Sequence, residues 1–210
     1  TGSLIDASRK RAARAMVEAG LPCTEEEVYR LQKELTDKYG PYHLVFNEIV
    51  NKYHADNKLV TIAYKAYNSS EVSEIKLFPY VVTTLKELKD KGCKVFLLTV
   101  GVHERQERKI NILGLKPYFD EIVINDQEIG LLVEDCVKDL LRRHNIMPGE
   151  AVMVGDKARD ELRIAKLQGM ITIQMLHGRF KNEPAVNECD RPDYKIKRIF
   201  QIPTILQLNN

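Results

Sequence analysis

The feature that most constrains the fold is an alternation of short apolar runs with amphipathic helical patterns from about Phe78 onward. The apolar runs are "KVFLLTV", "EIVIN", "AVMVGD", "ITIQML" and the shorter "DYKI". A helical pattern at 80–92 precedes the first run, others at 103–115, 134–145 and 158–169 lie between the first four, and one more follows near "IPTILQL". Short apolar strands between such helices are typical of βαβ units, whose parallel sheet is covered on both faces. We therefore predict a doubly wound α/β core.

The segment before Phe78 has a different pattern, which predicts consecutive helices from about Leu4 to Tyr67. Ala12, Ala13, Met16 and Val17 recur at helical spacing, and Gly20 ends that helix. Thr24, followed three residues later by Glu27, predicts a capping box at the start of the next helix. The segment is poor in strand patterns and rich in tyrosine, so we expect a separate helical block.

Length and charge limit the classes of function. A chain of 210 residues suits one domain, or a core domain with a small appendage. A net charge of +2 gives no electrostatic argument for nucleic acid or a membrane as partner. The four cysteines form no C-x-x-C pair, which is typical of a reduced intracellular protein, and the longest apolar run is too short to span a bilayer. With no secretory signal pattern, we expect a cytoplasmic location.

Two predicted strands end in groups that could bind a ligand, and ligands of such sheets bind beyond the carboxyl ends of the strands. "FLLTVG" carries Thr99 and then Gly101, which frees the backbone; "AVMVGD" ends in Asp156, with Asp160 four residues on. Two carboxylates one helical turn apart could hold Mg²⁺, and a threonine hydroxyl could donate to a phosphate oxygen. Alternatively, Asp156 caps the next helix and Asp160 lies in its first turn. The residues alone leave both interpretations open.

Taken together, these segments resemble the haloacid dehalogenase (HAD) superfamily of hydrolases. The strand ending in Thr99 resembles its second motif, and "VGDKARDE" followed by "AKLQGMITIQM" resembles its fourth; "ILGLKPYFDEIVIND" is similar to the intervening stretch. The resemblance implies a HAD-like Rossmannoid core formed by residues 1–6 and 77–210, with a small helical cap at 7–76 inserted after the first motif. It also implies metal binding by Asp156 and Asp160.

The start of the chain resembles only the tail of the family's first motif, D-x-D-x-T. In "TGSLIDAS", Ser3 takes the position of the motif's threonine, Gly2 precedes it, and Thr1 replaces the second aspartate. The resemblance implies catalytic roles for Thr1 and Ser3 and substrate contacts by Gly2 and Gly101. The nucleophilic aspartate, and the central first strand that carries it, are then expected just upstream of Thr1.

The third motif departs from the family's pattern. The family places a Lys-Pro pair soon after the third strand, whereas "IGLLVEDCVKDLL" has leucine and valine there. Lys138, two turns into the helix, is a weak substitute, and we expect Lys109 to pair with acidic neighbours on its own helix. Val100 is a further departure, since relatives often carry Asn or Asp after the threonine.

The favoured interpretation is a Mg²⁺-dependent phosphomonoester phosphatase that acts on a small phosphorylated substrate through an aspartyl-phosphate. In it, Thr99 holds a phosphate oxygen. The second interpretation is a catalytically impaired HAD-like module that binds a phosphorylated ligand or a protein partner. A receiver-like or flavodoxin-like regulator ranks last, because those folds lack a long helical block near the N-terminus.

Overall fold

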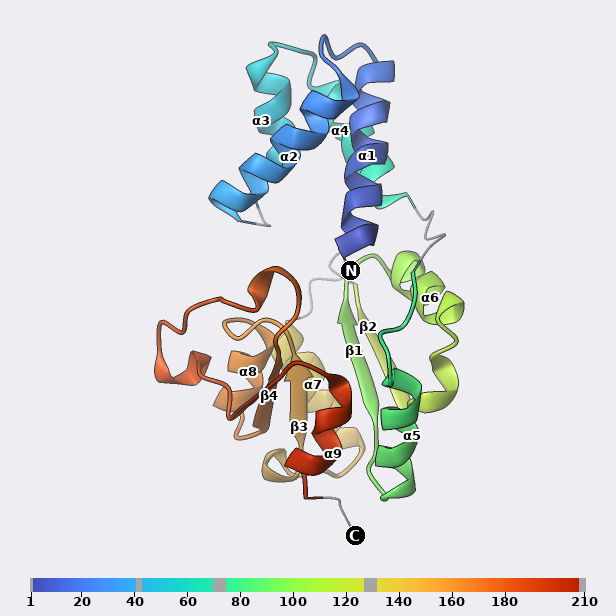
Figure 1. Cartoon of the computed structure of the whole chain (residues 1–210), viewed down its shortest axis with the longest axis vertical. Helices are drawn as coiled ribbons and strands as arrows, with labels where there is room; N and C mark the ends of the chain where they lie inside the picture. The colour runs from blue at the N-terminus through green and yellow to red at the C-terminus, as the bar shows by residue number, and fades with distance from the viewer. Residues whose placement is uncertain (1, 41–42, 70–74, 127–131, 208–210) are drawn as a thin grey trace. The chain divides into compact units, whose positions relative to one another are not determined.

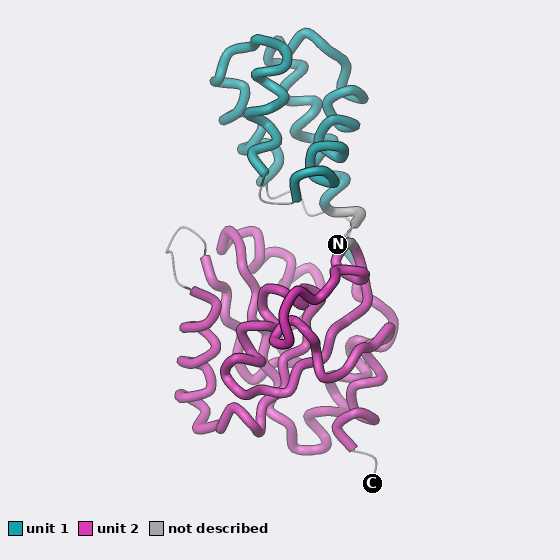
Figure 2. The backbone as a smooth tube through the Cα atoms, turned by 90° about the vertical axis from the view of Figure 1, so that its left-hand side faces the viewer, with its two compact units in different colours: residues 1–75 teal, residues 76–210 magenta. Residues whose placement is uncertain are grey.

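The computed structural model describes residues 2–40, 43–69, 75–126 and 132–207. The chain divides into two compact units, unit 1 (Thr1–Ile75) and unit 2 (Lys76–Asn210), which Figure 2 colours separately. Helix α1 runs unbroken from Gly2 to Glu18, so residues 2–6 form its first turns and group with unit 1. The assignment of residues 1–6 to the α/β core stays a prediction.

Unit 1 contains the helices α1 (Gly2–Glu18), α2 (Glu25–Tyr39), α3 (Val45–Lys52) and α4 (Lys58–Asn68) (Figure 1). Its core contains residues from all four helices: Ala12, Ala13, Met16, Leu21, Val28, Phe46, Ile49, Val50, Leu59 and Ala63. The predicted capping box is confirmed, because the Glu27 N–H donates to Thr24 Oγ1 and the Thr24 N–H donates to Glu27 Oε2. The predicted helical spacing of Ala12, Ala13 and Met16 is confirmed by their burial.

Unit 2 confirms the predicted alternation of strands and helices. In chain order it contains α5 (Val81–Asp90), β1 (Phe96–Val100), α6 (His103–Ile112), β2 (Glu121–Asn125), α7 (Val133–Arg143), β3 (Val152–Gly155), α8 (Glu161–Leu167), β4 (Ile171–Met175), β5 (Tyr194–Ile196) and α9 (Ile202–Ile205). Short 3₁₀ turns lie at Lys116–Tyr118, Pro148–Glu150, Gly178–Phe180, Glu188–Asp190 and Ile199–Gln201. Within the described ranges, no helix is long and apolar enough to cross a membrane.

All strand pairs of unit 2 are parallel, and they form two groups. β1 pairs with β2, while β4 lies between β3 and β5. Among the described strands, none pairs with the second edge of β1 or of β3. Side chains beside these edges are more exposed than usual for inner strands, since Val100 is 39% and Val154 38% exposed. The open edges lie where the family resemblance expects its first strand.

Helices cover both faces of the strands, as a doubly wound arrangement requires. Because side chains alternate along a strand, neighbouring residues of β1 face opposite layers. Leu97 packs in a cluster with Leu85 of α5 and Ile110 of α6, while Leu98 packs in another with residues of α7 and α8. The second cluster also contains Met153 of β3, so side chains join the two groups of strands.

Candidate active site

The two strand ends singled out in the sequence lie at the same edge of unit 2. Figure 1 shows β1 and β3 running in the same direction. Thr99 is the fourth residue of β1, in register with Ile124 of β2, and Asp156 follows β3 directly. Both residues are half-buried. Unit 2 therefore carries a hydroxyl and a carboxylate at the carboxyl-terminal ends of two strands, the edge at which open α/β sheets bind ligands.

A second carboxylate, Glu161, lies against the end of β3. A Cβ atom built on Gly155 would lie 2.8 Å from Glu161 Oε1 and 2.9 Å from its Cγ, so only glycine leaves room for this side chain. Glu161 Oε1 also accepts the Lys157 N–H at 3.0 Å. Burial raises the pKa of Glu161, and the nearby charge of Asp156 raises it further, while backbone N–H groups act in the opposite direction.

Asp160, the predicted partner of Asp156, has a different environment. It is the N-cap residue of α8 but makes no side-chain capping bond, and its Oδ2 accepts from Lys157 Nζ at 3.1 Å. Its side chain is 41% exposed. The helix begins at Glu161, not at Ala158 as expected, and this later start turns Glu161 rather than Asp160 onto Gly155. The metal-binding role of Asp160 stays a prediction, and Glu161 is the stronger candidate.

Gln174, in β4, is hydrogen-bonded to the loop that carries Asp156. Its side chain is 2% exposed, and its Nε2 donates to the Asp156 carbonyl oxygen at 3.2 Å and the Phe180 carbonyl oxygen at 3.5 Å. Because a buried amide needs hydrogen-bond partners, these two bonds connect Gln174 to the backbone of both loops. Sequence reasoning missed both Gln174 and Glu161. For Gln174 the available signal was a glutamine inside the apolar run "ITIQML".

The loop after β1 has the glycine conformation that the sequence predicts. Gly101 has φ +141°, and its N–H donates to the Asn125 carbonyl oxygen at 3.0 Å. Gln106 of α6 lies over this loop, with its Nε2 donating to the Val100 carbonyl oxygen at 2.7 Å. Asn125, 4% exposed at the end of β2, is a further polar residue beside the loop that sequence reasoning missed.

The two lysines considered as cations have different surroundings. Lys138 lies on an exposed part of α7, where its Nζ contacts Glu134 at 2.6 Å. Its catalytic role stays a prediction, and this ion pair argues against it. The expectation that Lys109 pairs with acidic neighbours is wrong: its Nζ donates to the neutral Gln106 Oε1 at 3.1 Å. Burial lowers the pKa of Lys109 to about 8, and the charge of Arg105 acts in the same direction.

Other predicted residues are placed only in part. Thr1 lies outside the described residues, and Gly2 and Ser3 lie in the first turn of α1. Their roles stay predictions. Leu132 and Val133, at the position of the family's Lys-Pro pair, form the start of α7. In the described part of the chain, no group of three or more metal-ligating side chains is assembled.

Comparison with known proteins agrees with this arrangement. A profile of the haloacid dehalogenase-like hydrolase family matches residues 14–174. A glyceraldehyde 3-phosphate phosphatase of Methanopyrus kandleri is 34% identical over 94% of this chain and 88% of its own length. One from Methanocaldococcus jannaschii is 30% identical over 99% and 91%. The crystal structure of a HAD phosphatase from Thermococcus onnurineus superposes with a TM-score of 0.66 at 24% identity, covering 97% and 90% of the two chains. The chain belongs to the haloacid dehalogenase-like hydrolase family.

Proposed function

We propose that this protein is a Mg²⁺-dependent phosphomonoester phosphatase that acts through an aspartyl-phosphate. The observation that carries the proposal is the pair of carboxylates, Asp156 and Glu161, held at the end of β3 on the same edge as Thr99. A hydroxyl donor beside two carboxylates suits a phosphate group together with a hard cation.

The donor set fits Mg²⁺, which prefers carboxylate oxygens in combination with water and phosphate. Asp156 and Glu161 are the residues that would hold it, since Glu161 lies against Gly155, the residue before Asp156, and the charge of Asp156 contributes to raising the pKa of Glu161. When bound, the ion supplies positive charge that stabilises the phosphoryl oxygens during transfer. Asp160 remains a second candidate ligand, with its bond to Lys157 as the competing interaction.

Thr99 and the aspartate expected upstream of Thr1 would carry the remaining steps. Thr99 donates its hydroxyl to a non-bridging phosphate oxygen. A carboxylate oxygen of the aspartate expected upstream of Thr1 attacks phosphorus as the P–O ester bond breaks, and the departing alkoxide takes up a proton from water to leave as the alcohol. Water then attacks the phosphorus of the aspartyl-phosphate, releasing inorganic phosphate and regenerating the carboxylate. The open edges of β1 and β3 are consistent with a strand that carries this aspartate between them.

The relatives suggest a class of substrate. The two archaeal relatives described above are named for glyceraldehyde 3-phosphate, a small phosphomonoester. We extend this to the present chain as a preference for short phosphorylated carbon chains. The helical unit is the expected source of finer selectivity.

The experiment is a phosphate-release assay on the full-length polypeptide. Glyceraldehyde 3-phosphate and a panel of other small phosphomonoesters are supplied with Mg²⁺ or with EDTA, and Asp156→Asn serves as the inactive control. The proposal expects release that needs Mg²⁺ and Asp156. Release that continues in EDTA, or in the Asp156→Asn protein, contradicts it.

The alternative is a HAD-like module that binds a phosphorylated ligand without turning it over. It is favoured by Leu132 and Val133, which occupy the position of the family's lysine at the start of α7. Trapping with beryllofluoride and Mg²⁺ separates the two functions, because only a competent nucleophile forms the stable adduct. Saturable phosphate binding without an adduct or turnover supports the module and excludes the phosphatase.

A further inference from the structure

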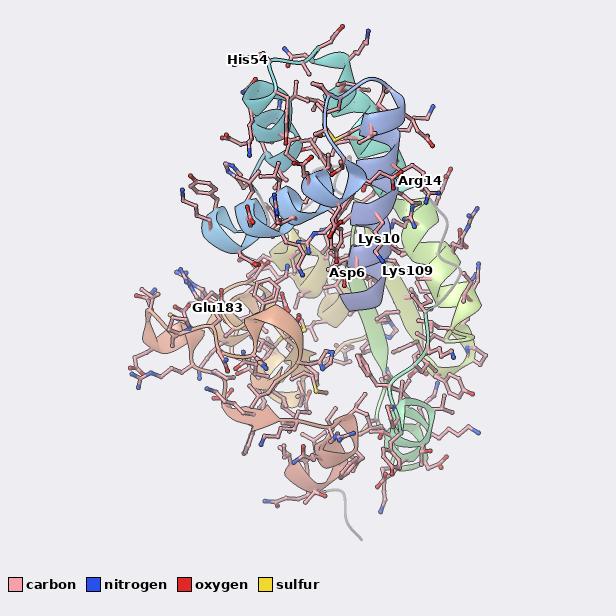
Figure 3. All side chains as sticks on the ribbon, turned by 45° about the horizontal axis from the view of Figure 1, so that its top comes forward. Asp6, Lys10, Arg14, His54, Lys109 and Glu183 are labelled. Atoms are coloured by element: carbon pink, nitrogen blue, oxygen red, sulfur yellow. The ribbon has the colours of Figure 1, made fainter. Side chains whose placement is uncertain are left out.

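A chain of two side-chain hydrogen bonds connects helix α6 to the loop after β1. Lys109 Nζ donates to Gln106 Oε1 at 3.1 Å, and Gln106 Nε2 donates to the Val100 carbonyl oxygen at 2.7 Å. A Cβ atom at Gly101 would lie 2.6 Å from Gln106 Nε2, so this glycine makes room for the amide. Figure 3 shows Lys109 on α6.

The chemistry of the two ends determines how the amide of Gln106 is oriented. An ammonium group can only donate hydrogen bonds, and a carbonyl oxygen can only accept them. The opposite orientation would place amide NH₂ against the ammonium of Lys109 and amide oxygen against the Val100 carbonyl. Lys109 and the Val100 carbonyl therefore favour the same orientation, in which Gln106 binds the loop.

The fold itself does not require a cation at Lys109. Lys89, Lys116, Lys138 and Lys166 each contact a carboxylate of unit 2. Within the described ranges, Lys109 has no carboxylate at ion-pair distance. Arg105 is the charged neighbour that acts on it, and Asp126 beyond β2 is bonded to the His103 N–H instead. A half-buried ammonium is costly to a fold unless it is paired, and among the described residues of unit 2 the Lys109 ammonium bonds only to the neutral Gln106 amide.

We propose that Lys109 and Gln106 are positioning residues for the phosphate-binding loop: Lys109 orients the Gln106 amide, which holds the Val100 carbonyl and so fixes the backbone on both sides of it, at Thr99 and Gly101. This inference rests on the proposed function, since the loop binds phosphate only if the protein is a phosphatase or a phosphate-binding module. The role is one of geometry, because both residues act through Val100.

Four variants test the inference. Lys109→Met removes the donor and keeps the apolar stem, while Lys109→Arg keeps a donor. Gln106→Glu keeps the acceptor for Lys109 but places a carboxylate oxygen against the Val100 carbonyl. Lys116→Met is the matched control, because Lys116 is an exposed lysine of the same unit paired with Glu107. Circular dichroism establishes that each variant is folded.

The first readout is hydrogen exchange at the Gly101 N–H, which is bonded to the Asn125 carbonyl oxygen. We expect about tenfold faster exchange in Lys109→Met and Gln106→Glu, and wild-type rates in Lys109→Arg and Lys116→Met. The second is steady-state kinetics, in which kcat falls about tenfold in the same two variants and KM changes less. Lys109→Arg is expected to recover most of kcat.

The two readouts keep this inference separate from the proposed function. Unchanged Gly101 exchange in either Lys109→Met or Gln106→Glu overturns the positioning role, even where activity falls. If the wild type releases no phosphate from any ester tested, the proposed function fails, and the exchange rates alone decide whether the bond chain holds the loop.

Discussion

Replacing Lys109 by methionine is expected to stabilise the fold at neutral pH while impairing the site. Burial lowers the pKa of this lysine from 10.5 to about 8, so folding disfavours its charged form. Below pH 8 the native state bears the full cost of holding the ammonium. Between pH 8 and 10.5 the native state has released its proton and the unfolded state has not, so stability rises with pH. The Lys109→Met protein has no titrating group at this position, so its stability does not rise with pH through this effect.

The magnitude follows from the size of the pKa shift. A shift from 10.5 to about 8 corresponds to about 3.4 kcal/mol at about 1.36 kcal/mol per pH unit. Lys109 is only partly buried, and solvent screening reduces this to about 1–2 kcal/mol. We therefore expect the stability advantage of Lys109→Met over wild type to shrink by about 0.5 kcal/mol between pH 7 and pH 9.5.

The assay is urea unfolding at both pH values, read by hydrogen exchange of peptides from α6 so that the transition reports unit 2. Lys116→Met is the control, because it removes an exposed lysine that is paired with Glu107. It shows how much the free energy of unfolding changes with pH when any lysine of unit 2 is replaced by methionine. A stability difference between Lys109→Met and wild type that stays constant from pH 7 to 9.5, or that grows, refutes the reasoning.

Three further predictions concern the carboxylates and unit 1. Glu161→Gln should lower kcat/KM about tenfold to a hundredfold in phosphate-release assays at fixed Mg²⁺. Asp160→Asn should lower it no more than about threefold in the same assay. Equal losses in the two variants would contradict the structural distinction between these carboxylates. Met16→Ala should destabilise unit 1 by about 2–5 kcal/mol, because the Met16 side chain is fully buried. Urea unfolding followed on α1 and α2 measures this change. A loss of stability below about 1 kcal/mol would contradict the core described for unit 1. Thr24→Ala should cost unit 1 about 1 kcal/mol in the same assay through loss of the capping box, and an unchanged transition would show that the cap contributes nothing.

Much of the fold could be predicted from local pattern. The apolar runs of unit 2 and the capping box at Thr24 depend on neighbours within a few residues, so the sequence carries them directly. The division of the strands into two groups could be anticipated only through the family resemblance. Pairing between strands depends on residues far apart in the chain, and no local pattern records which edge remains open.

The site was less predictable because single-residue differences decide it. Asp160 and Glu161 are adjacent carboxylates, and which one faces Gly155 depends on where α8 begins, a boundary that sequence patterns locate only to within a few residues. The partner of Lys109 follows from helix geometry. Residues three and four positions away share a face, and for Lys109 these are Gln106 and Arg105, whereas Glu104 and Glu107 lie at other spacings.

The most direct test of the account is the rate of phosphate release from glyceraldehyde 3-phosphate by the full-length wild type and by Asp156→Asn, each at saturating Mg²⁺. The account predicts turnover by the wild type and a loss of at least about a thousandfold in the variant, with unchanged circular dichroism. No turnover by the wild type on any small phosphomonoester, or equal rates for the two proteins, would contradict it.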